Sequence, residues 1–130
     1  MIGYRMTPDL ERIAWMPSPP LAPDDGPIDT EHLMRMTLGD ASLEQEVLTM
    51  FSAQTAGLVA ALAALPADAS ALAHTLKGSA RAIGAFAVAD AAERLEAALH
   101  GGGNPHPALS ELNDAVAGAR TAVEAMLRRS

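Results

Sequence analysis

The sequence predicts an all-α protein, a bundle in which one short helix precedes four longer ones. Hydrophobic residues make up 49% of the chain but aromatic residues only 3%, so alanine and aliphatic side chains must form the core. Alanine is the strongest helix former, whereas strands are enriched in β-branched and aromatic residues. Apolar residues recur at helical spacing, and strand-like alternation is absent. The length of 130 residues suits one domain.

Residues 1–27 are expected to form a separate tail, because six of the nine prolines lie within them. Each proline removes a backbone donor and restricts the residue before it. Thr7 and Pro8 suit the cap and the first turn of one short helix. Two states are open for this tail. It is partly disordered, or it docks on the domain through Ile13, Trp15 and Met16.

The bundle is expected over residues 28–130, and its first two helices are marked by caps and helix breakers. The first helix begins at Asp29 or Thr30 and stops at Gly39. The second runs from about 41 to 65, and Pro66 ends it. Apolar residues recur along the second helix at helical spacing: Leu43, Val47, Met50, Phe51, Leu58, Leu62 and Leu65.

The last two helices flank a run of three glycines at 101–103. The fourth runs from about Phe86 to His100. The fifth opens at Asn104, a cap, with Pro105 at the first helical position. The glycines lack the Lys-Ser/Thr of a phosphate-binding loop and lead into a proline, so they are read as a flexible turn.

The third helix, from near Asp68 or Ser70 to Gly84, has two distinct faces. One face is a stripe about 100° wide that is expected to face the core: Ala69, Leu72, Leu76, Ser79, Ala80 and Ile83. The opposite face spans a similar arc of about 100°, and its residues should share one exposed surface: His74, Lys77, Gly78 and Arg81.

The polar face has the residues for handling an anion. Lys77 is the only lysine, and with Arg81 it brings positive charge near His74 on an otherwise acidic chain. An exposed neutral imidazole is a competent nucleophile, and nearby cations can hold phosphoryl oxygens. Gly78 costs about 1 kcal/mol relative to alanine within a helix, which suggests close approach by a partner. An exposed histidine with basic neighbours is otherwise ordinary solvated surface.

Residues 73–80 (AHTLKGSA), 83–85 (IGA) and 95–96 (LE) resemble the signature of the histidine-containing phosphotransfer (HPt) domains of bacterial two-component phosphorelays. The similarity extends from Ile28 through Phe51 to about Leu99, and the last helix agrees only in pattern. The resemblance implies a four-helix up-and-down antiparallel bundle with an additional short N-terminal helix. It also implies that His74 projects into solvent from the second helix of the bundle.

The resemblance implies a phosphorelay intermediate rather than an enzyme. His74 accepts a phosphoryl group from the aspartate of a hybrid kinase's receiver domain and passes it to the aspartate of a response regulator. Lys77 orients or stabilises the phosphoryl oxygens, and Gly78 gives the receiver room. Glu96 occupies a position where several members have a glutamine bonded to the imidazole. Two readings stay open for this carboxylate: contact with His74, or pairing with Arg94 or His100.

A receiver domain needs an apolar surface on which to dock, because specific interfaces have a desolvated apolar centre. The first helix supplies candidates beside His74, two of them methionines, whose adaptable side chains suit two different receivers. These candidates are Leu33, Met34, Met36 and Leu38, and each could instead pack inward. No cofactor or metal site is predicted. The Mg²⁺ needed for transfer is expected from the receiver's acidic pocket.

Charge and composition limit the other partners. Nine basic against sixteen acidic residues give a formal charge of -7, the wrong sign for nucleic acid. No apolar run approaches the roughly 18 to 20 residues of a membrane span, and there is no signal segment. The chain is therefore expected to be a cytoplasmic monomer. The alternative function is a helical adaptor that binds a signalling partner through its bundle surface, with His74 inert.

Overall fold

The computed structural model describes residues 26–129, which form five α-helices and no strand. The helices are α1 (Thr30–Met36), α2 (Ala41–Leu62), α3 (Ala69–Ile83), α4 (Phe86–Gly101) and α5 (His106–Arg129). The prediction of an all-α protein is confirmed for this part of the chain. The short helix predicted at Thr7, and the docking of Ile13, Trp15 and Met16, lie outside the described residues.

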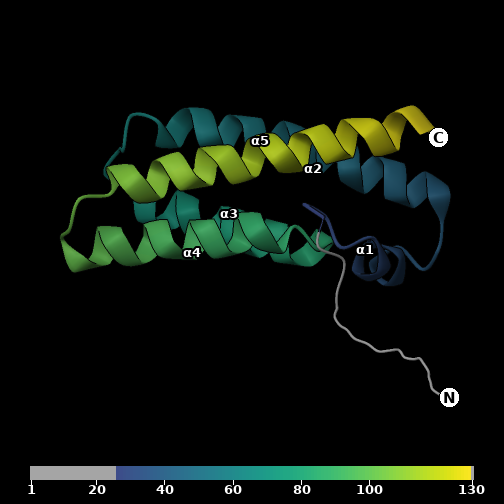
Figure 1. The fold of residues 1–130 in the computed structure, drawn as a ribbon, viewed down its shortest axis with the longest axis horizontal. Helices are drawn as coiled ribbons and strands as arrows, with labels where there is room; N and C mark the ends of the chain where they lie inside the picture. Colours follow the sequence, from purple (N-terminus) through teal and green to yellow (C-terminus); the bar gives the residue numbers. More distant parts are fainter. Residues whose placement is uncertain (1–25, 130) are drawn as a thin grey trace, which may run out of the picture.

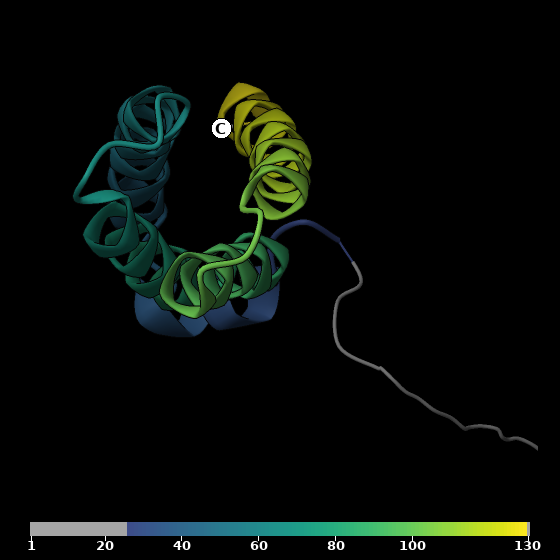
Figure 2. The ribbon, with the colours of Figure 1, turned by 90° about the vertical axis from the view of Figure 1, so that its left-hand side faces the viewer.

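Four long helices pack side by side and one short helix covers an end. Figure 1 shows α2, α3, α4 and α5 along the long axis of the molecule. Each packs on the next in sequence, and α5 also contacts α2, so the four enclose a common interior (Figure 2). Helix α1 packs against α3. The arrangement is consistent with the helical bundle that the resemblance implies.

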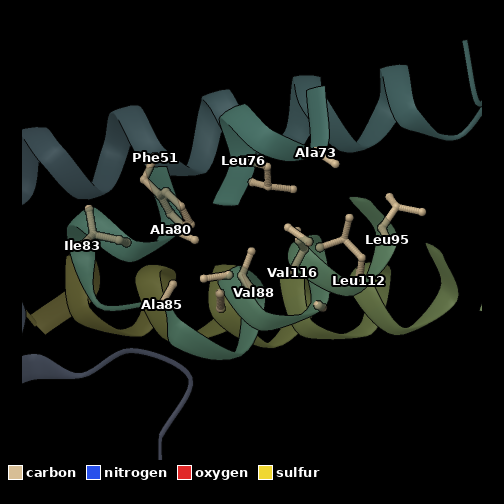
Figure 3. Packing of buried hydrophobic residues seen from close by; sticks show 14 of the residues in the cluster. Phe51, Ala73, Leu76, Ala80, Ile83, Ala85, Val88, Leu95, Leu112 and Val116 are labelled. Carbon is tan, nitrogen blue, oxygen red and sulfur yellow. The ribbon is translucent and has the colours of Figure 1, made fainter. Parts of the chain in front are cut away.

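The core consists of aliphatic side chains interleaved with alanines. Leu76, Leu95 and Leu112 come from α3, α4 and α5, are fully buried, and point into the interior with Phe51 of α2 (Figure 3). The core-facing stripe predicted on α3 is buried at Ala69, Leu76, Ala80 and Ile83, whereas Leu72 and Ser79 are only half-buried. The small alanines let neighbouring backbones approach closely, which is how a chain with few aromatic residues fills its core.

Helix α2 ends three residues earlier than the apolar pattern predicts. Its last residue is Leu62, and Leu65 has a φ of 48°, outside the helical range. The residue before a proline is disfavoured in the helical conformation, so the chain turns before Pro66 rather than at it. Predicted and observed bounds agree more closely for α4, which extends one residue beyond His100.

A tight corner joins α1 to the junction of α3 and α4. Asp29 caps α1 by accepting a hydrogen bond from the His32 backbone N, and its own N donates to the Gly84 carbonyl at 2.9 Å. Gly84 ends α3, as predicted, in the left-handed conformation with φ 89°. His32 Nε2 donates to the Ala82 carbonyl at 3.2 Å, and its ring lies edge-on to Phe86. These contacts hold α1 on the end of α3.

The turn between α4 and α5 is less crowded. Gly102 ends α4 with φ 72°, the same left-handed conformation as Gly84, but no atom lies within 4 Å of a Cβ built there. Asn104 Oδ1 accepts from the His106 backbone N at 3.0 Å, and the Pro105 carbonyl accepts from Leu109. Helix α5 therefore begins at His106, one residue later than predicted.

Candidate functional site

The polar face of α3 presents one histidine to solvent. Burial of Ala73, Leu76 and Ala80 against the core directs the opposite side of the helix outward. His74 lies on that outward side, with 68% of its side chain exposed. The buried residues before and after His74 fix the rotation of α3 about its axis. The His74 side chain therefore leaves the helix on the side that faces solvent.

A carboxylate from α4 contacts the ring. Glu96 Oε2 lies 3.1 Å from His74 Nδ1, and its Oε1 accepts from Lys77 Nζ at 2.9 Å. The contact between His74 and Glu96, left open by the sequence, is therefore present. The other two candidate partners of Glu96 are engaged elsewhere: Arg94 donates to Glu111 at 2.8 Å, and His100 contacts Ser70 at 2.6 Å.

Lys77 is less exposed than the sequence predicts. Only 16% of its side chain is accessible, so the prediction that it shares one exposed surface with His74 is wrong. The helical wheel places the residue on the outward side but takes no account of α4, whose Glu96 binds the ammonium. The hydrogen bond from Lys77 lowers the pKa of the Glu96 carboxyl, burial opposes this, and the hydrogen bond from His74 lowers it further.

Arg81 stands apart from this group of three. It donates to Glu93 Oε1 at 2.7 Å, and both side chains are about half exposed. Seven residues separate it from His74, which is about 10 Å along a helix axis. Among the described residues, Arg81 therefore pairs with Glu93 and makes no hydrogen bond to the His74 group.

Gly78 lies one turn after His74 with open space beside it. A Cβ built on Gly78 meets no atom within 4 Å. Within the described chain, then, packing gives no reason for a residue that costs about 1 kcal/mol relative to alanine. The same holds for Gly57 on α2, which gives an internal control.

The four candidate docking residues on α1 and the turn after it divide into two groups. Leu33 is fully buried in the core, so its prediction as a docking residue is wrong: it is the side chain through which α1 packs inward. The other three are exposed, with Met34 at 59%, Met36 at 53% and Leu38 at 88%.

A groove between α2 and α3 was missed by the sequence analysis. It has a volume of about 190 Å³ and is mostly apolar, and its lining residues are Val47, Met50, Phe51, Gln54, Ser79, Ala82 and Ile83. Met50 fits the helical spacing of the apolar pattern but is 68% exposed, while Leu48 is buried. Helical spacing also places Leu48, Phe51, Thr55 and Leu62 on one face of α2. That alternative would have predicted Leu48 in the core and Met50 outside it.

Among residues 26–129, no group of three or more histidine, aspartate or glutamate side chains is placed to hold a metal ion. Over the same range, none of the helices has the length and hydropathy that a membrane-spanning segment requires.

Comparison with known families supports the resemblance. A family model described as "Hpt domain" matches residues 46–129, more than half of the chain. The match includes α5, which resembled the family only in pattern, and leaves out α1. It contains His74, Lys77, Gly78 and Glu96. Comparisons with curated proteins and with solved structures gave no match. A histidine exposed on the matched part of a helical bundle agrees with the chemistry of that family, and the chain belongs to the Hpt domain family of phosphorelay histidine phosphotransfer carriers.

Proposed function

We propose that this protein is a phosphorelay intermediate in which His74 carries the phosphoryl group. It accepts the group from an aspartate of a hybrid kinase's receiver domain and passes it to the aspartate of a response regulator. The observation that carries the proposal is the ring of His74, which is mostly exposed while Glu96 engages Nδ1. His32 and His100 instead use their Nε2 atoms in contacts with Ala82 and Ser70.

The chemistry requires a nucleophilic nitrogen and a partner that supplies the rest. The Nε2 lone pair of His74 attacks phosphorus, the aspartyl O–P bond breaks, and its electron pair leaves with the aspartate carboxylate. Transfer to the second receiver runs the same steps in reverse. Lys77 and Arg81 are the cations of this face, and each is paired with a carboxylate of α4. Mg²⁺ comes with the receiver, since Glu96, the carboxylate that contacts His74, already accepts a hydrogen bond from Lys77.

The scaffold in this proposal is a four-helix up-and-down antiparallel bundle, acting as a cytoplasmic monomer. The contacts of each helix with the next, and of α5 with α2, support that topology.

Mixing the full chain with a radiolabelled, phosphorylated receiver tests the function. A carrier removes the label from the receiver and holds it in acid-labile form. The exposed Met34, Met36 and Met50 favour the alternative of an adaptor, which binds the receiver and leaves its label in place.

Gly78→Gln is expected to slow phosphotransfer at least about tenfold while slightly stabilising α3. The added side chain extends from an open position one turn from His74, where a docking receiver must approach. Glutamine is also the better helix former, by somewhat less than about 1 kcal/mol. Transfer rates, receiver affinity and thermal unfolding measure the three effects. Gly57→Gln is the matched control, since it makes the same change on α2 in open space. Normal transfer by Gly78→Gln would contradict the close approach.

Alanine substitutions at Met34, Met36 and Leu38 are expected to weaken receiver binding without lowering the melting temperature. All three side chains are more than half exposed, so truncation leaves no cavity in the fold. Leu33→Ala is the contrasting control, with an expected loss of about 3 kcal/mol of stability because the residue is fully buried. Calorimetry and receiver titration measure both quantities. If the alanine variants at the three exposed positions bind the receiver normally, the docking surface lies elsewhere. The groove at Met50 is then the next surface to substitute.

A further inference from the structure

The groove between α2 and α3 has a buried apolar floor and an exposed rim. Phe51 of α2 and Ile83 of α3 are buried core residues (Figure 3), whereas Met50 is 68% exposed. None of the lining residues is charged, and the volume is about 190 Å³. An enclosed apolar cavity of about 150 Å³ holds a benzene molecule, so the groove has room for an aromatic ring.

The only tryptophan of the chain lies at position 15, before the residues that the structure describes. Trp15 belongs to a run of four apolar residues at 13–16 (IAWM), between Arg12 and Pro17. Segments that stay solvated are poor in aromatic residues, and one aromatic side chain buries about 150 to 250 Å² when it packs. The run therefore has the composition of a segment that binds to a surface.

The spacer between this run and the bundle is long enough to reach the groove. The first described residues are anchored at the end of α3. Asp29 N donates to the Gly84 carbonyl at 2.9 Å, and Gly84 directly follows Ile83 of the groove. The nine residues 17–25 include four prolines. Extended as polyproline, at about 3.1 Å per residue, they span roughly 28 Å, more than two helix diameters.

The groove also offers a hydrogen-bond partner for an indole ring. Gln54 and Ser79 contribute polar side chains to its lining. Each has an oxygen that can accept a hydrogen bond, and a buried tryptophan usually bonds its N–H to such a group. The uncharged lining suits a run that has no charged side chain. Linkage through the spacer also gives the run a high effective concentration at the groove.

We propose that residues 13–16 bind in the groove between α2 and α3, with the ring of Trp15 over Phe51 and Ile83. The inference does not depend on the proposed phosphotransfer function. It gives the tail a binding site on its own bundle. The bound run covers Met50, so any other partner of the groove must first displace the tail.

The fluorescence of Trp15 measures its burial directly, because the chain has no other tryptophan. We expect the full chain to emit at a shorter wavelength than free tryptophan in the same buffer, and acrylamide to quench the emission several-fold more slowly. Both readings should stay constant when a micromolar solution is diluted about a hundredfold, since the tail and the groove share one chain. Emission like that of free tryptophan overturns the inference. Burial that is lost on dilution also overturns it, because the groove then binds the tail of a second copy.

Substitutions in the groove test where Trp15 binds. Met50→Glu and Ala82→Glu place a charge on each wall, and both side chains are exposed, so the bundle should stay folded. Each variant should shift the emission and the quenching rate to the values of solvated tryptophan, because an apolar run no longer covers the charged wall without cost. Met50→Leu keeps the rim apolar and should leave both readings unchanged.

Met34→Glu is the matched control. Met34 is exposed on α1 and does not line the groove, so its substitution should leave the emission of Trp15 at the wild-type wavelength. Trp15 that stays buried in both groove variants, or that is released by Met34→Glu, overturns the inference. Far-UV circular dichroism checks that every variant is folded. The two proposals fail separately, since a chain that takes no label from a receiver contradicts the phosphotransfer function alone.

Discussion

His74→Gln is expected to abolish the acid-labile label that the proposed carrier would take from a phosphorylated receiver, a loss of at least about a thousandfold in rate. A glutamine amide nitrogen has no nucleophilic lone pair, so no N–P bond forms. The ring makes no core contact and 68% of it is exposed, so the helical circular dichroism and the melting temperature should stay within error of the wild type. Radiolabel transfer, measured beside both structural readouts, gives the result.

Glutamine at the three other histidines provides the matched controls. His32 bonds to the Ala82 carbonyl, His100 contacts Ser70, and His106 begins α5. Each variant should take up label at the wild-type rate, with His32→Gln losing some stability at the corner that holds α1. Label that persists in His74→Gln, or that disappears in one of the three controls while the chain stays folded, would assign the phosphoryl group to a different histidine.

Gly84→Ala is expected to lower the free energy of unfolding by about 3 kcal/mol. Two causes add. The backbone has φ 89°, a region in which an L side chain is strained by roughly 1 to 2 kcal/mol. A Cβ at this position would also lie 2.9 Å from the Asp29 carbonyl oxygen, so α1 must move away from the end of α3. Chemical denaturation measures the loss.

Gly102→Ala separates the two causes. Gly102 ends α4 in the same left-handed conformation, with φ 72°, but a Cβ there meets nothing within 4 Å. Its substitution should therefore cost only the backbone strain, about 1 kcal/mol. Equal losses for Gly84→Ala and Gly102→Ala would show that the contact with Asp29 does not matter. A larger loss at Gly84, together with weaker receiver binding, would tie the seating of α1 to docking.

The order and type of the helices could be predicted from the sequence because their signals are local. Asp29, Gly84 and Asn104 act on backbone groups within a few residues, so a cap or a stop can be read without knowing the tertiary contacts. The end of α2 could not be placed as well. The pattern of apolar residues continues to Leu65, but backbone conformation before Pro66 ends the helix earlier.

The position of His74 on an outward face was likewise predictable, since it follows from the helical period and the apolar stripe of a single helix. The surroundings of that face were not. Leu33 and Met34 are adjacent apolar residues on a short helix, and only contact with α3 decides that the first is buried and the second exposed. On α2 the same ambiguity led Met50, rather than Leu48, to be included in the apolar pattern.

The sequence by itself determined the all-helical class, the caps and the polar face with His74, because each depends on residues within a few turns of one another. Tertiary structure alone decided that Lys77 is covered and that Glu96 bridges Lys77 to the ring. Glu96 lies on a different helix, 22 residues after His74. Whether the two meet depends on the rotation and spacing of α3 against α4, which the core side chains of all four long helices set together.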